Sequence, residues 1–209
     1  MRSIIYILFF LSLSINAYAF NEECINSKEF PFCIYKDSKL DFIILRNEKE
    51  VGWHKVIFEK TSDGFNAITT AYIKARYLLF LDYIFIYSAK SNWVNNQLNS
   101  HEVKIDDDGD EYNISIHKIT EDLLEITDQD NKTITISKNN VLPSEHWHPY
   151  EVKYNTMINT LNGEVIDTKV SKVNNNTWFV DGEVKYYINY DNKGKWTGLK
   201  FNADEDTVI

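Results

Sequence analysis

The chain has 209 residues, with 31 acidic residues against 22 basic ones and a net charge of −9. An acidic surface repels phosphate groups, so we expect neither nucleic acid nor an anionic membrane surface as a partner. Tyr (13) and Phe (12) are abundant while Gly (7) and Pro (3) are scarce. Enrichment in aromatic residues favours strands over helices.

Residues 1–19 have the pattern of a secretory signal peptide. Arg2 supplies a positive charge, residues 4–15 are mostly apolar, and Ala17 and Ala19 form a small-x-small cleavage site. The alternative is a membrane anchor, but the apolar stretch is shorter than the roughly 20 residues that a spanning helix requires. We therefore expect cleavage after Ala19, no stable membrane span after cleavage, and a secreted bacterial protein in the periplasm.

Two cysteines, Cys24 and Cys33, lie close to the expected new N-terminus. An exported chain meets an oxidising compartment, which favours a disulfide between them. The alternative, a redox or metal-binding pair, lacks both the C-x-x-C spacing and an adjacent His. Closing the small loop between the cysteines would contribute about 2–3 kcal/mol and hold the N-terminal end in place.

From Leu40 onward, apolar and polar residues alternate between turn signals, which is typical of strands. In chain order, we expect strands at residues 40–47, 51–60, 65–80, 82–93, 97–105, 111–119, 123–127, 132–138, 164–170, 177–181, 183–190 and 196–203. Pro143 and Pro149 interrupt this pattern, and a short helix fits residues 149–155. The sequence predicts one all-β domain over residues 20–209, an antiparallel meander curled into a half-barrel or open barrel. A two-sheet sandwich is the alternative.

The run YLLFLDYIFIY, residues 77–87, permits two interpretations. It could be a buried bend between two neighbouring strands, or it could be the apolar wall of a lipid-sized cavity. Asp82 and the shortness of the run argue against a transmembrane span.

No catalytic motif is recognisable in the sequence. The chain lacks G-x-S-x-G, H-E-x-x-H, a phosphate-binding glycine loop and a dinucleotide fingerprint. We therefore name no catalytic residues, no cofactor and no metal site.

The segment Glu145-His146-Trp147-His148 has the pattern closest to a metal site. On an extended backbone His146 and His148 would point to the same side, as a shared cation requires, and Glu145 or Glu151 could add a carboxylate. A third histidine ligand would come from His54, His101 or His117. The alternative is that the two histidines flank a tryptophan that packs in the core.

Aromatic residues at the strand ends supply the remaining candidates. Tryptophans there pack over a core edge or line a cleft that holds a sugar or an acyl chain. Gly52 is expected where two backbones come close, and the neighbours Trp53 and His54 should point to opposite faces of their strand. The candidate binding residues are Trp53, His54, Trp93, His146, Trp147 and His148.

Five segments follow one another in a particular order: VGWHKVIFE, Trp93–Leu98, SEHWHPY, NTLNGEV and YYINYDNKGKWTGLKF. Their order resembles that of an uncharacterised family of Gram-negative periplasmic proteins, classed as a domain of unknown function, over about residues 40–203. The resemblance implies export and a mostly antiparallel β fold, and it implies no activity. Ser91 departs from the family, which tends to have an acidic residue at that position.

Three functions remain open on the sequence alone. The first is a monomeric, non-catalytic periplasmic binding or accessory protein for an apolar or envelope-derived ligand. The second is a metal-assisted hydrolase or lyase that uses His146 and His148. The third is a structural envelope protein that acts through partner proteins.

Overall fold

The computed structural model describes residues 20–78, 81–203 and 206–208. The predicted signal peptide, residues 1–19, lies outside the described residues, and so do residues 79 and 80 of the apolar run. Most of the described chain forms strands, with a short helix α1 (Glu22–Ile25) and a 3-10 helix η1 (Pro149–Lys153). In the part of the chain that the structure describes, no helix is long and apolar enough to cross a membrane.

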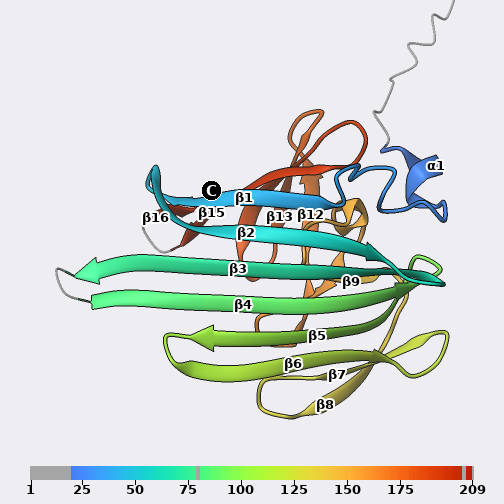
Figure 1. Ribbon diagram of the computed structural model, residues 1–209, viewed down its shortest axis with the longest axis horizontal. Coiled ribbons are helices and arrows are strands. Elements are labelled where there is room, and N and C mark those ends of the chain that lie inside the picture. The colour runs from blue at the N-terminus through green and yellow to red at the C-terminus, as the bar shows by residue number, and fades with distance from the viewer. Residues whose placement is uncertain (1–19, 79–80, 204–205, 209) are drawn as a thin grey trace, which may run out of the picture.

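Strands from both halves of the chain form the main antiparallel sheet (Figure 1). The first half supplies β1 (Lys39–Arg46), β2 (Lys49–Lys60), β3 (Gly64–Leu78), β4 (Leu81–Val94), β5 (Gln97–Asp107), β6 (Asp110–Lys118), β7 (Leu123–Thr127) and β8 (Thr133–Ser137). The second half supplies β12 (Lys169–Lys172), β13 (Thr177–Asp181), β14 (Lys185–Tyr190), β15 (Trp196–Ala203) and β16 (Asp206–Val208). The order across the sheet is β12 to β16 followed by β1 to β8, so β16 pairs with β1.

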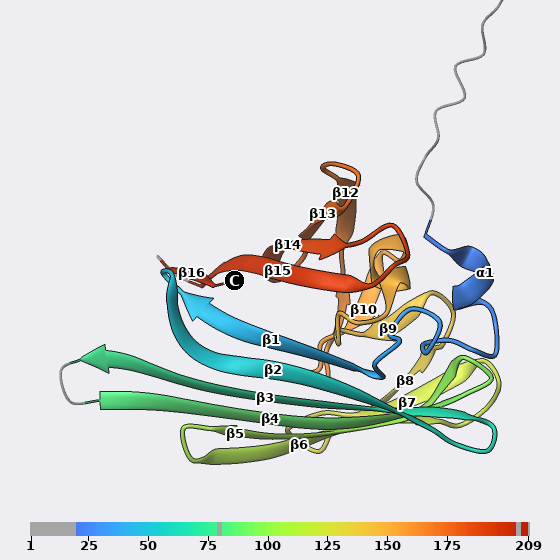
Figure 2. The same cartoon turned by 45° about the horizontal axis from the view of Figure 1, so that its top comes forward.

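The sheet curls, but among the described strands it does not close, because β8 and β12 remain its two edges. Figure 2 shows β13 to β15 lying across from β3 to β6, with β9 and β10 between these two layers. This arrangement confirms the predicted all-β fold with a curled, open sheet.

A second, three-stranded sheet was not predicted. It consists of β9 (Val141–Pro143), β10 (Thr156–Ile158) and β11 (Val165–Asp167), and β9 and β10 pair in parallel. Together with η1 it belongs to residues 141–168, which we call the plug because this segment packs inside the curl of the main sheet. The predicted short helix after Pro143 is confirmed as η1.

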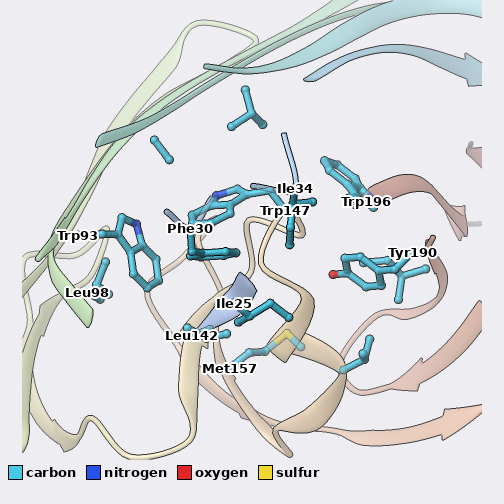
Figure 3. Close-up of a cluster of buried hydrophobic side chains, with 14 of the residues drawn as sticks. Ile25, Phe30, Ile34, Trp93, Leu98, Leu142, Trp147, Met157, Tyr190 and Trp196 are labelled. Carbon is cyan, nitrogen blue, oxygen red and sulfur yellow. The ribbon is translucent and has the colours of Figure 1, made fainter. Parts of the chain in front are cut away.

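Trp147 of the plug lies in the middle of the core (Figure 3). Its side chain is 1% exposed and packs edge-on against Phe58, Phe65 and Trp93. The hydroxyl of Tyr35 donates a hydrogen bond of 2.6 Å to the Trp147 carbonyl. The core is therefore built around an aromatic side chain that the plug carries into the sheet.

The N-terminal segment closes one end of this core. Cys24 and Cys33 form the predicted disulfide. Phe30, within the disulfide loop, is buried and packs 6.1 Å from Trp147 between ring centres. The bridge thus fixes a loop whose side chains are part of the core.

Candidate functional site

A cavity of about 300 Å³ occupies the part of the curl that the plug leaves unfilled. One side is formed by the concave face of β1 to β4, and the plug forms the second. The third side comes from β14, from β15 and from the turn that joins β13 to β14. All three layers of the fold therefore contribute to its wall.

Apolar side chains make up much of this wall. They come from every side of the cavity: Ile44, Ile73, Phe85, Met157, Leu161, Ile166, Val184, Leu199 and Phe201. Phe85 and Tyr87 belong to the run at residues 77–87, which was interpreted either as a plain bend or as a cavity wall. These two residues line the cavity, whereas Ile86 between them points outward and is 42% exposed.

Because Gly52 has no side chain, the backbone of β2 can lie close to that of β3 beside the cavity. A Cβ atom at this position would lie 1.9 Å from the carbonyl oxygen of Tyr72. Gly52 also faces Ile44, next to the irregularity in the β1–β2 register. The expectation that Gly52 marks a close approach of two backbones is confirmed.

The floor of the cavity is polar and centres on Glu145 of the plug. Tyr87 donates a hydrogen bond of 2.5 Å to Glu145 Oε1, and Thr69 donates to Oε2. His101 Nε2 lies 3.6 Å from Oε1, which is too long for a hydrogen bond. Burial lowers the pKa of His101 more than the charge of Glu145 raises it, so this contact is not an ion pair near neutral pH. Glu145 is thus held by β3 and β4 while its side chain is only 6% exposed.

A second buried carboxylate, Glu151, orients His146. His146 Nδ1 lies 2.9 Å from Glu151 Oε1, and the Tyr186 hydroxyl donates to the same oxygen at 2.6 Å. Burial alone would lower the pKa of His146, but the charge and hydrogen bond of Glu151 outweigh it and raise this pKa. A protonated His146 is therefore paired with a carboxylate in direct contact.

Two polar atoms near the cavity lack a hydrogen-bond partner among the described residues. They are His54 Nδ1 and Thr168 Oγ1, both buried, and both residues line the cavity. Burial lowers the pKa of His54 to about 4, so its imidazole is neutral near pH 7. A bound molecule with a polar group could satisfy these atoms.

Of the candidate binding residues, His54 and His146 line the cavity and the other four do not. The assumption that His146 and His148 share one side was wrong, because His146 has a φ of 65° and the backbone there is not extended. His148 instead stacks on Trp93 at 5.5 Å, and its Nδ1 accepts a hydrogen bond from the Tyr150 N–H at the start of η1.

The three candidate tryptophans, Trp53, Trp93 and Trp147, lie outside the cavity lining. Trp53 lies on the outer face of the sheet and is 37% exposed, opposite in direction to His54 as expected for neighbours in a strand. Trp93 and Trp147 are buried in the core. Trp93 Nε1 donates a 2.8 Å hydrogen bond to Ser91 Oγ, so the side chain of Ser91 accepts from this indole.

No group of three or more His, Cys, Asp or Glu side chains within the described ranges is arranged to hold a metal ion. Glu145 and Glu151 were expected only as possible extra metal ligands, and their hydrogen-bond partners Thr69, Tyr87 and Tyr186 were not predicted. The available signal was the placement of two acidic residues within the aromatic segment SEHWHPYEV, which indicates buried and hydrogen-bonded carboxylates.

The fold and this cavity define a class of protein, an open, barrel-like β-protein partly filled by its own chain. The family described as "Domain of unknown function (DUF6134)" matches residues 42–209, so the chain belongs to that family. This match confirms the resemblance to an uncharacterised domain family.

A solved structure shares the fold. It is the crystal structure of a beta-barrel-like protein of the domain of unknown function DUF1849 from Brucella abortus, with a TM-score of 0.57 and 7% identity. The match covers 81% of this chain and 92% of that chain. At this identity the likeness concerns the fold alone. No curated protein matches the chain.

Proposed function

We propose that the protein is an exported, non-catalytic binding protein that holds a small, mostly apolar ligand in its cavity. The observation that carries this proposal is the cavity of about 300 Å³ with largely apolar walls and a polar floor. Binding sites for small molecules have this composition, with volumes from about 300 to 1,000 Å³.

The construction of the wall supports binding without a large rearrangement. Strands β1 to β4 are fixed by long hydrogen-bonded ladders, and the plug is fixed by Trp147 in the core. A site whose wall is already ordered loses little conformational entropy when a ligand binds.

The signal-peptide pattern and the disulfide support export to the periplasm. A binding protein in that compartment would meet molecules derived from the cell envelope. The proposed ligand class is therefore an apolar molecule of envelope origin.

Filling the cavity tests this proposal. Ala71 lines the cavity and is 6% exposed, so Ala71→Leu should occupy ligand space. We expect the fluorescence of N-phenyl-1-naphthylamine to rise on mixing with the wild-type protein. The rise should be reduced at least about fivefold by Ala71→Leu, because the added side chain takes the place of the dye.

The matched control is Ser88→Leu, which adds the same side chain to the exposed outer face of the adjoining strand. This variant should bind the dye as the wild type does. Absence of binding by the wild type, or equal binding by Ala71→Leu and the wild type, would rule out this cavity as the site.

A further inference from the structure

The cavity has an asymmetric charge. The ionisable side chains among its described lining residues are Glu145, Glu183, His54, His146, Tyr87 and Tyr186, and no described lining residue is Lys or Arg. We propose that the cavity selects ligands whose polar head is a cation that donates hydrogen bonds, such as a primary alkylamine, and disfavours carboxylates such as fatty acids. This inference rests on the proposed binding function and specifies the class of ligand.

The two carboxylates stand at different depths of the cavity. Glu145 is at the floor, and each of its oxygens accepts one hydrogen bond, from Tyr87 or Thr69. A carboxylate oxygen can accept two, so both retain capacity for a further donor. Glu183 is exposed near the mouth, where Asn159 Nδ2 donates to it at 3.2 Å. A cationic head would meet a carboxylate on entry and another at the floor.

The histidines do not cancel this negative charge. His54 is neutral near pH 7 because burial lowers its pKa to about 4. His146 is paired with Glu151 at 2.9 Å, so any positive charge on its ring is offset by that carboxylate. Apart from His146, whose ring is in contact with Glu151, no described lining residue offers Glu145 a cationic partner.

The hydrogen-bonding atoms of the floor favour the same class of ligand. The hydroxyl donors of Tyr87 and Thr69 are already directed to Glu145. Acceptor capacity remains on Glu145, whereas the Thr168 hydroxyl and His54 Nδ1, which have no partner among the described residues, can each serve as donor or acceptor. An ammonium group brings three donors and no acceptor, whereas a carboxylate brings only acceptors and a like charge.

Three ligands with the same alkyl chain separate the contribution of the head group from that of the tail: octylamine, 1-octanol and octanoate. We expect titration calorimetry of residues 20–209 at pH 7 to give at least about tenfold tighter binding for octylamine than for 1-octanol, because charge-assisted hydrogen bonds are the stronger ones. Octanoate should bind most weakly, since its charge would be buried near Glu145.

Two variants locate the preference within the cavity. Glu145→Gln should reduce the advantage of octylamine over 1-octanol to less than about threefold while 1-octanol still binds. Glu183→Gln alters an exposed side chain and should weaken octylamine binding about twofold to threefold. Glu59→Gln, on the exposed end of β2 and outside the cavity lining, should change neither affinity.

The ranking of the three ligands on the wild-type protein decides the question even if Glu145→Gln fails to fold. If 1-octanol and octylamine bind equally, or if octanoate binds most tightly, the inference about the head group is overturned while the proposed binding function stands. If none of the three ligands binds and the dye does not bind either, the proposed function itself is overturned.

Discussion

At the scale of single residues, the segment around Trp147 combines structural and binding roles in adjacent positions. Trp147 and His148 are buried in the aromatic core, whereas Glu145 and His146 face the cavity. The positive φ of His146 separates these two groups. One turn in the backbone therefore decides which side chains support the fold and which are accessible to a ligand.

Trp147 and Trp53 were both candidate binding residues, but replacing them with Ala should lower the free energy of unfolding by very different amounts. Trp147→Ala should lower the free energy of unfolding by about 3–5 kcal/mol, because a fully buried aromatic side chain leaves a large cavity. Trp53→Ala, at an exposed position, should cost less than about 1 kcal/mol. Urea denaturation measures both values, and similar losses would contradict the placement of Trp147 in the core.

His148 should make the fold sensitive to mild acid. Burial lowers its folded pKa from 6.5 to about 3, so between these values the unfolded chain binds a proton that the folded chain does not. Stability from this residue is complete above pH 6.5 and is lost as the pH falls, by up to about 1.4 kcal/mol per pH unit. His54 and His101, whose pKa values are also lowered, contribute in the same direction.

The variant His148→Asn keeps a side-chain acceptor at the start of η1 and removes the titrating ring. Denaturation between pH 6.5 and about pH 4.5 should show a shallower dependence on pH than in the wild type. His146 has a raised pKa, so its contribution is lost only as the pH rises above 6.5 and does not interfere in this window. Parallel curves for the two proteins would show that His148 is not the group responsible.

At the scale of elements, the ladder between β2 and β3 depends on a missing side chain. Gly52→Ala should destabilise the protein by about 1–3 kcal/mol, because its Cβ would meet the Tyr72 carbonyl and the strands would have to separate. Gly198→Ala in β15 is the control, since the atom nearest to its Cβ is 3.7 Å away. Thermal unfolding of both variants tests this difference, and equal melting temperatures would argue against the close approach.

The elements that could be predicted from sequence are those whose pattern is local. The long strands alternate over eight residues or more, as in β2 and β3, and this period is visible without knowing the partners. Strands β9 and β10 have three residues each, too few to show a period, and their parallel pairing joins segments that are not neighbours in sequence. The plug was therefore predicted as a break, a short helix and the beginning of a strand at residues 164–170. That predicted strand is divided in the structure between β11 of the small sheet and β12 of the main sheet.

Less of the candidate site could be predicted from sequence, because its residues come together from distant segments. His54 and His146 were identified by residue type, but the hydrogen bonds from Tyr87 and Thr69 to Glu145 span 58 and 76 residues of sequence. The left-handed backbone of His146 has only a weak signal in its residue type, since positive φ is uncommon for residues other than Gly even though His adopts it more often than most. Contacts between distant segments thus set the chemistry of the cavity.

At the scale of the whole molecule, the expected cleavage point coincides with a buried residue. Phe20 is 7% exposed and packs 5.2 Å from Trp178 and 5.6 Å from Tyr190 between ring centres. Removal of residues 1–19 would leave this aromatic anchor in place. We expect protein recovered from the bacterial periplasm to have an intact mass that corresponds to a start at Phe20 with one disulfide. A mass that retains residues 1–19, or reduced protein in the cytosol, would contradict export.

The pairing of β16 with β1 has a consequence for synthesis and transport. Among the described residues, the bridge between these strands joins Arg46 to Val208, so one of the two neighbours of β1 is the last described strand. A nascent chain crossing a membrane from its N-terminus would display the open edge of β1 until β16 has been made. Exposed strand edges recruit other chains, and contacts this distant form slowly. The chain itself can therefore cover the open edge of β1 only after β16 has been made.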